Sequence, residues 1–206
     1  MKVNPVFAAG IAMLNFTHSE DQANDFKIQP LMTNMHSFSG PRFAKGDVNG
    51  DKLDDIFICG PRNHPGRLFL QQRDGNYRED VQRIFSADMV YEDCGAVFFD
   101  ADNDGDLDLY VVSGGLQIED SVQLEDCLYL NDRGKFTKPK GLLPTKAFAG
   151  AVIVPLDFDK DGDLDLFAPG RVIPGEYPTS PQSRLLVNEL VRVVFDPQKV
   201  QAELSL

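Results

Sequence analysis

The sequence has no tryptophan and only three cysteines and three histidines in 206 residues. Cys59, Cys94 and Cys127 form no CxxC pair and have no histidine at the spacing of a zinc site. Their odd number leaves at least one free thiol. Three buried thiols are favoured over a disulfide between Cys94 and Cys127, and the pattern does not decide the redox compartment.

Basic residues and long apolar runs are also scarce. The 20 lysines and arginines stand against 32 acidic residues, which gives a net charge of −12. This balance argues against a nucleic-acid partner, because a phosphate backbone requires a basic surface. No apolar run approaches the about 18 residues of a membrane-spanning helix, so no membrane insertion is expected. Residues 6–14 follow Lys2 as a signal-peptide core would, but Gly10 interrupts them and no clear cleavage site follows.

The acidic residues gather in three windows that repeat along the chain. Residues 47–55, 100–108 and 157–165 hold four, five and five acidic side chains. The aligned segments read GDVNGDKLDDIFICG from Gly46, DADNDGDLDLYVVSGG from Asp100 and DFDKDGDLDLFAPG from Asp157. Their first aspartates are 53 and 57 residues apart, which is the length of one four-stranded propeller blade with loop insertions.

Each acidic window lies between two apolar runs, which predict strands covered on both faces. The runs before the windows are 42–45, 96–99 and 151–156, and the runs after them are 56–59, 107–112 and 164–168. A third strand is predicted at 67–71, 127–131 and 184–188. In the first two repeats a turn containing glycine follows, and a fourth strand begins at Tyr77 and Phe136.

This pattern predicts an all-β chain, a partial β-propeller of about three four-stranded antiparallel blades. The acidic loops join strands one and two of each blade. The expected blades are 41–80, 94–138 and 149–195, within a region of 41–195. A leader with one strand at 14–17 occupies residues 1–40, and a tail without repeat signal occupies 196–206.

The windows carry oxygen-bearing side chains at positions 1, 3, 5 and 9, counted from the first aspartate. Alternate residues of a curled loop point inward, and position 7 can add its backbone carbonyl, so the set suits two to three Ca²⁺ ions. The predicted ligand residues, position 7 included, are Asp47, Asn49, Asp51, Leu53 and Asp55; Asp100, Asp102, Asp104, Asp106 and Asp108; and Asp157, Asp159, Asp161, Asp163 and Asp165.

Two details refine this prediction. An EF-hand needs a glutamate at position 12, but the three windows have Ile58, Val111 and Ala168 there, so that alternative fails. Loop one has Lys52 at position 6, where the other loops have glycine. The lysine adds positive charge and a side chain at a sharp turn, so loop one is expected to be the weakest site.

These loops resemble the FG-GAP/VCBS repeats of integrin α-subunit propellers and of many secreted bacterial proteins. The third-strand segment CLYLNDRGKF resembles the VCBS branch linked to ASPIC/UnbV domains. The resemblance covers about residues 10–189. It implies a calcium-binding module of an extracellular or cell-surface protein that binds protein or carbohydrate ligands in adhesion.

Three blades leave two sheet faces uncovered, because propellers close with four to eight blades. Further blades are therefore expected, either from a longer chain of which this is a piece or from a second copy. The first alternative is favoured because the repeats stop abruptly.

Catalysis is not expected. No HExxH, GxSxG, P-loop or GxGxxG motif occurs. A hydrolase or lyase acting on polysaccharide, with paired carboxylates, remains an alternative, as does a purely structural scaffold. For a binding module, the long connection after the third repeat offers Arg171 and Tyr177 as ligand-binding residues, although a connection without any partner explains it equally well.

Overall fold

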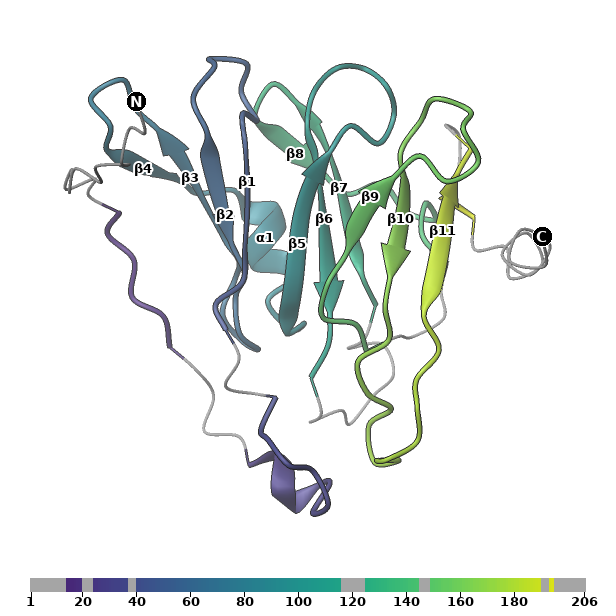
Figure 1. Cartoon of the computed structure of the whole chain (residues 1–206). Coiled ribbons are helices and arrows are strands. Elements are labelled where there is room, and N and C mark those ends of the chain that lie inside the picture. The colour runs from purple at the N-terminus through teal and green to yellow at the C-terminus, as the bar shows by residue number, and fades with distance from the viewer. Residues whose placement is uncertain are drawn as a thin grey trace, which may run out of the picture.

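The computed structural model describes residues 14–19, 24–36, 40–115, 125–144 and 149–189, and the backbone of residues 193–194. These residues form three four-stranded antiparallel sheets (Figure 1). In chain order the strands are β1 (Phe43–Gly46), β2 (Asp55–Ile58), β3 (Arg67–Gln71) and β4 (Tyr77–Asp80); β5 (Asp93–Phe99), β6 (Asp108–Ser113), β7 (Cys127–Asp132) and β8 (Lys135–Thr137); β9 (Val154–Leu156), β10 (Asp165–Ala168), β11 (Arg184–Asn188) and β12 (Val193–Val194). The predicted all-β class is confirmed.

The sheets are arranged as consecutive blades of an open propeller. Within each sheet the strands pair in sequence order, so each blade is an up-and-down meander. The first strands of successive blades lie side by side, β1 against β5 and β5 against β9. The predicted partial β-propeller is therefore confirmed for the described part of the chain.

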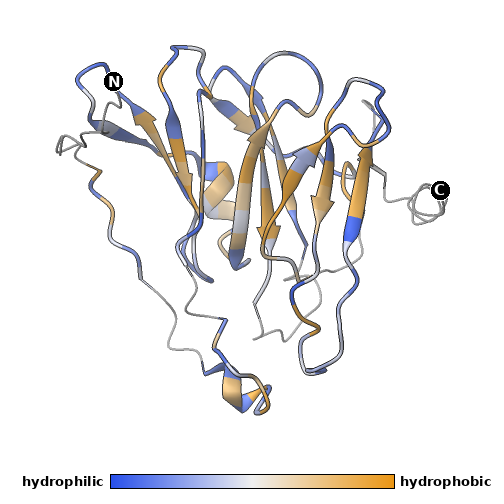
Figure 2. Cartoon of the chain, in the orientation of Figure 1, coloured by the Kyte–Doolittle hydropathy of each residue, from blue (hydrophilic) through white to orange (hydrophobic). Residues whose placement is uncertain are grey.

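Two apolar cores lie between the blades. The strands that line them consist largely of hydrophobic residues (Figure 2). All six residues of β6 are buried because this strand contributes to both cores. Leu109 and Val111 belong to the core shared with the first sheet, and Tyr110 and Val112 belong to the core shared with the third. A strand packed on both faces has no polar side to alternate with, which explains its continuous apolar sequence.

A short helix between the first two sheets was not predicted. Helix α1 (Arg83–Ala87) follows β4 and places Phe85, 4% exposed, in the first core. The Phe85 ring centroid lies 5.2 Å from that of Phe57, 5.3 Å from that of Tyr129 and 5.7 Å from that of Phe136. One turn of helix has too short an apolar pattern to be recognised in sequence.

The strand predicted at residues 14–17 is not formed, because residues 14–19 have no strand pairing. Phe16 instead packs edge-on against Phe69 of β3, with ring centroids 6.0 Å apart, and the Arg67 guanidinium lies 5.4 Å from the Phe16 ring. The segment thus contacts a side-chain face of the sheet rather than a backbone edge. A 3-10 helix, η1 (Asp25–Lys27), follows it. The predicted tail, 196–206, and residues 6–13 of the signal-like run lie outside the described residues.

Candidate metal centre

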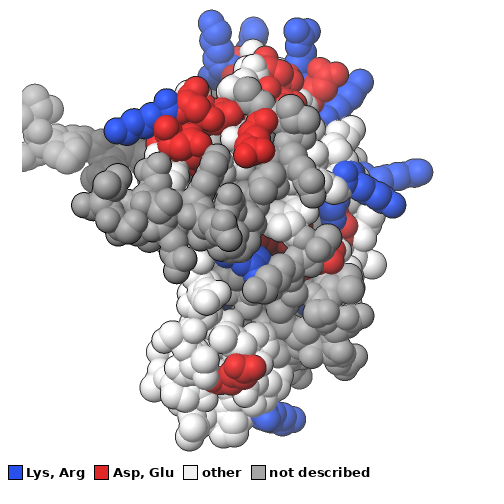
Figure 3. Space-filling view, turned by 90° about the vertical axis from the view of Figure 1, so that its right-hand side faces the viewer, with Lys and Arg blue, Asp and Glu red and all other residues white. Residues whose placement is uncertain are grey.

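The three acidic loops occur at equivalent places in the three sheets. They join β1 to β2, β5 to β6 and β9 to β10, and they lie at one end of the blades (Figure 1). Acidic side chains gather at this end, with lysine and arginine side chains beside them (Figure 3). The repeated topology therefore places the three predicted sites on a common face of the molecule.

The loops also share their backbone conformation. Position 6 has a positive φ in every copy, at 70° for Lys52, 92° for Gly105 and 100° for Gly162. Glycine adopts this conformation without steric cost, whereas lysine does not. Loop one therefore folds like the other two in spite of its less favourable residue.

The aspartate at position 9 is fully buried in all three loops, and its carboxylate accepts two backbone hydrogen bonds. Asp108 accepts from the N–H of Ala101 at 2.7 Å and from that of Asn131 at 2.8 Å. The same bonds run from Val48 (3.1 Å) and Gln71 (2.8 Å) to Asp55, and from Phe158 (2.8 Å) and Asn188 (2.8 Å) to Asp165. Position 9 thus ties its loop to the second and third strands.

Burial has an electrostatic cost for these carboxylates. It raises the pKa of Asp108 to about 6, and the nearby carboxylates of Asp102 and Asp104 add to the shift. Burial likewise raises the pKa of Asp55 to about 6. A cation beside the carboxylate would lower both pKa values, because it stabilises the ionised form.

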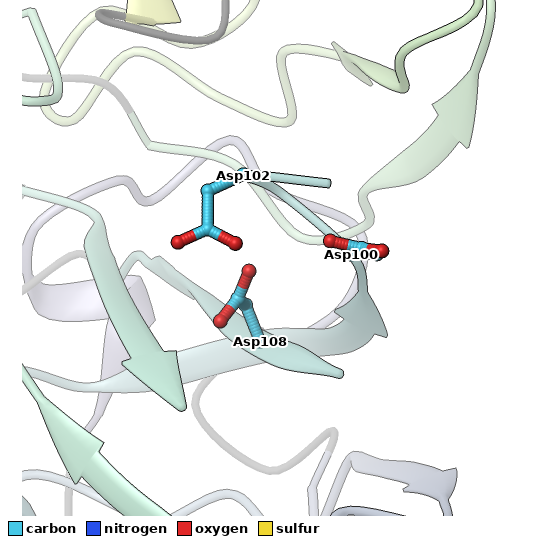
Figure 4. A group of neighbouring side chains, drawn as sticks. All are labelled: Asp100, Asp102 and Asp108. Atoms are coloured by element: carbon cyan, nitrogen blue, oxygen red, sulfur yellow. The ribbon is translucent and has the colours of Figure 1, made fainter. Parts of the chain in front are cut away.

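Loop two brings three carboxylates together. Asp100, Asp102 and Asp108 each place an oxygen within 4.8 Å of the others (Figure 4). Asp100 Oδ2 accepts a hydrogen bond from Gly105 N–H at 3.0 Å, while Asp100 Oδ1 is buried and has no hydrogen-bond partner among the described residues. An unpaired buried carboxylate oxygen is costly unless a cation contacts it. The residues present therefore fit a metal ion.

Two predicted ligands of loop two lie outside this group. Asp104 accepts the N–H of Asp106 at 2.9 Å, and Asp106 accepts the N–H of Arg133 at 3.0 Å. Burial is the main cause of the raised pKa of Asp102, and the nearby carboxylate of Asp104 raises that pKa further. The side chain of Asp106 thus links the loop to the β7–β8 turn. That position 7 adds its backbone carbonyl to a metal site stays a prediction.

Loop three forms two overlapping carboxylate groups. One joins Asp157, Asp159 and Asp165, and the other joins Asp159, Asp161 and Asp163. Asp163 was predicted to offer its backbone carbonyl, but its side chain is 4% exposed and its Oδ1 has no hydrogen-bond partner in the described region. The hydrogen bond with Asp161 raises the pKa of Asp163 to about 6 and lowers that of Asp161. These five carboxylates also fit a metal ion.

Loop one differs, since no group of three carboxylates forms there among the described residues. Asp47 accepts hydrogen bonds from the N–H groups of Gly50, Asp51 and Lys52, at 2.8, 3.2 and 2.7 Å. Asn49 and Asp51 accept from backbone N–H groups two residues ahead, at 2.9 Å each. The side-chain oxygens of loop one therefore accept hydrogen bonds from the loop's own backbone. That loop one is the weakest site stays a prediction.

The two predicted ligand-binding residues lie in the β10–β11 connection. Arg171 Nη2 donates to the backbone carbonyl of His36 at 3.4 Å, so the guanidinium contacts the leader. Tyr177 is 39% exposed. Their part in ligand binding stays a prediction.

Histidines and cysteines that are far apart in sequence meet at the opposite end of the blades. His18, His36, Cys59, Cys94 and Asp93 line a cavity of about 20 Å³, which has room for about one water molecule. Burial raises the pKa of Asp93 to about 7. No three of these side chains come close enough to hold a metal, within the residues described. All three cysteines are free and buried, so the disulfide alternative is not realised.

Sequence reasoning missed two asparagines in the third strands of the second and third blades, Asn131 next to the last residue of β7 and Asn188 as the last residue of β11. Asn131 and Asn188 are each 4% exposed. Their side-chain amides reach the acidic loop of the preceding blade, Asn131 at Val48 O and Asn188 at Ala101 O, both at 2.8 Å. The repetition of Leu-Tyr-Leu-Asn and Leu-Leu-Val-Asn was the available signal.

Comparison with known proteins agrees with this architecture. No helix in the described part of the chain is long and apolar enough to span a bilayer. No curated protein matches the sequence. The sequence profile of the FG-GAP-like repeat matches residues 47–111, which include acidic loops one and two, strands β2 to β4 of the first sheet and strand β5 of the second. Residues 47–111 are therefore similar to the FG-GAP-like repeat family.

Proposed function

We propose that this chain is a non-catalytic, calcium-binding β-propeller module of an extracellular or cell-surface protein, which binds protein or carbohydrate ligands in adhesion. The observation that carries the proposal is the convergence of carboxylates in loops two and three, with buried oxygens that have no partner in the described residues at Asp100 and Asp163.

The chemistry of the donors supports calcium over other metals. The side chains in both groups are carboxylates, with no histidine or cysteine among them. Hard oxygen donors in such number suit Ca²⁺, which accepts six to eight of them, whereas zinc sites use nitrogen or sulfur and Mg²⁺ retains water. Two ions are expected in loops two and three, and a third, weaker one in loop one.

The expected part of the ion is structural. Bound calcium would neutralise carboxylates that otherwise repel one another across each loop. In loop two Asp100, Asp102 and Asp108 would hold it, and Asp108 already fixes the start of β6. An ion held mainly by protein oxygens has little room for a substrate, which supports a binding module rather than a hydrolase or lyase.

A partner surface is supported at the end of the blades away from the acidic loops. A pocket of about 430 Å³, within the size range of ligand sites, lies where β7 begins and β8 ends. Lys138, Lys140, Glu125 and Asp126 supply its polar groups, and leucines supply its apolar wall. Further blades, from a longer chain or a second copy, are the other proposed partner.

Calorimetric titration with Ca²⁺ tests the proposal. Asp102→Asn should remove or weaken binding in loop two, and Asp159→Asn should do so in loop three. Asp74→Asn is the matched control, because Asp74 is exposed in the β3–β4 turn, far from the acidic loops in sequence, and its carboxylate accepts hydrogen bonds from Asn76 of the same turn. Unchanged stoichiometry and affinity in both loop variants would refute the metal sites.

A further inference from the structure

The asparagines at the ends of β7 and β11 connect each blade to the acidic loop of the blade before it. Asn188 N–H donates to Asp165 of its own blade at 2.8 Å, and Asn188 Nδ2 donates to the Ala101 carbonyl of loop two at 2.8 Å. One buried residue thus contacts two acidic loops. The donor and acceptor atoms are buried, so the bonds are shielded from competing water.

Asn131 makes the same connection one blade earlier. Its N–H donates to Asp108 at 2.8 Å, and its Nδ2 donates to the carbonyls of Val48 in loop one, at 2.8 Å, and Leu107 in loop two, at 3.0 Å. Its Oδ1 accepts from Gly134 N–H at 2.7 Å. This last bond fixes the orientation of the amide, because only the nitrogen is then left for the two carbonyls.

The contacted carbonyl is well placed to position metal ligands. Ala101 stands between Asp100 and Asp102, two of the three carboxylates that converge in loop two. Its N–H is held by Asp108 from the same blade, and its carbonyl is held by Asn188 from the next. Val48 stands between Asp47 and Asn49 and is held in the same way by Asp55 and Asn131.

We infer that Asn188 and Asn131 are positioning residues for the acidic loops of the preceding blades, so that each blade sets the calcium affinity of its predecessor. The inference rests on the proposed function. Without the Asn188 side chain, the backbone at Ala101 keeps only its hydrogen bond to Asp108. The loop then loses conformational freedom when the ion binds, and this entropy cost lowers the calcium affinity.

The first blade supplies a natural control. Gln71 ends β3 and donates its N–H to Asp55 at 2.8 Å, as the asparagines do to their own aspartates. Its side-chain oxygen, however, accepts from Asp54 N–H at 3.1 Å within the same loop. Truncation of Gln71 therefore removes the aligned side chain without removing a contact to loop two.

The test measures calcium affinity in two parent variants, each of which keeps only one of the two strong sites. Asp159→Asn leaves loop two as the strong site, and Asp102→Asn leaves loop three. Adding Asn188→Ala should weaken calcium binding about three- to tenfold in the Asp159→Asn parent, as expected for the loss of one buried hydrogen bond. The same change should leave affinity within about twofold in the Asp102→Asn parent, because the backbone bond to Asp165 remains.

Each outcome has a defined meaning. If Asn188→Ala does not fold, Asn188→Ser takes its place, because its hydroxyl is too short to reach the Ala101 carbonyl. Equal weakening of calcium binding in both parents would indicate general destabilisation and would overturn the inference. Unchanged affinity in the Asp159→Asn parent would also overturn it. So would a Gln71→Ala change that weakens calcium binding in that parent as much as Asn188→Ala does. If neither parent binds calcium before the second substitution, the proposed function fails instead.

Discussion

Replacement of Asp108 by asparagine distinguishes the contribution of a bound ion to stability from that of the two backbone hydrogen bonds in loop two. The carboxylate accepts two backbone N–H groups, at 2.7 and 2.8 Å, but an amide has one acceptor oxygen. One buried N–H then loses its partner, which costs about 1–3 kcal/mol. Without calcium this loss is opposed by relief of the buried charge, whose pKa is raised to about 6. The two effects should nearly offset each other when calcium is chelated.

Calcium removes this balance. At a free concentration of about 100 times its dissociation constant, an ion stabilises the folded state by about 2.7 kcal/mol. If the variant binds about tenfold more weakly, the same concentration gives about 1.4 kcal/mol. Asp108→Asn should therefore lose about half or more of the calcium-dependent stabilisation attributable to loop two.

Urea denaturation with calcium and with chelator measures both quantities. Asp74→Asn should keep the whole calcium-dependent increment, because it changes charge by the same amount on an exposed turn. An Asp108→Asn protein with the wild-type increment would show that Asp108 does not contribute to a calcium site.

Three further predictions address acidity, packing and assembly. Burial raises the pKa values of Asp93 and Asp126 to about 7, so the folded state binds more protons than the unfolded state, and stability in chelator should fall as pH rises from about 5 to 8. Asp126→Asn should flatten that slope in urea melts, and an unchanged slope would contradict the assignment. Phe85→Ala should destabilise by about 3–5 kcal/mol, measured by its urea midpoint, because it empties the centre of the first core. Phe167 is 40% exposed, so the isolated chain should self-associate in light scattering and Phe167→Ser should reduce it; a clean wild-type monomer at high concentration would refute this.

The strands and the acidic loops could be predicted because both depend on local sequence. Turn residues such as the Asp-Gly pair before β4 mark where each hairpin reverses. Apolar runs such as that of β6 report burial on both faces. Three copies at blade spacing then distinguish a repeat from a chance turn, which a single window cannot do.

The remaining features depend on contacts between distant residues. The position of Phe85 between blades and the attachment of Phe16 to β3 require knowledge of the packed sheets. The strand predicted at residues 14–17 was wrong because apolar character alone does not supply a pairing partner. Asn188 was missed because its partner at Ala101 is 87 residues away.

Phe167 is exposed at a repeat position whose side chain is buried in the other two blades. It is the second residue after position 9, where the other blades have Phe57 and Tyr110. Those two side chains are 1% exposed because they pack between blades, whereas Phe167 is 40% exposed. The third sheet therefore presents a face of the same construction as the two that are covered, which is the basis of the proposed partner blade.

Hydrogen exchange on β6 and β10 tests most directly whether calcium is a structural part of the blades. If the ions hold Asp108 and Asp165 in place, chelation should increase exchange of amides in these two strands more than in β3, which is remote from the converging carboxylates. A matched measurement on Asp102→Asn should show the β6 increase already in the presence of calcium. Unchanged protection of β6 and β10 on chelation, together with loss of a chemical activity, would contradict the structural account and identify the metal as catalytic.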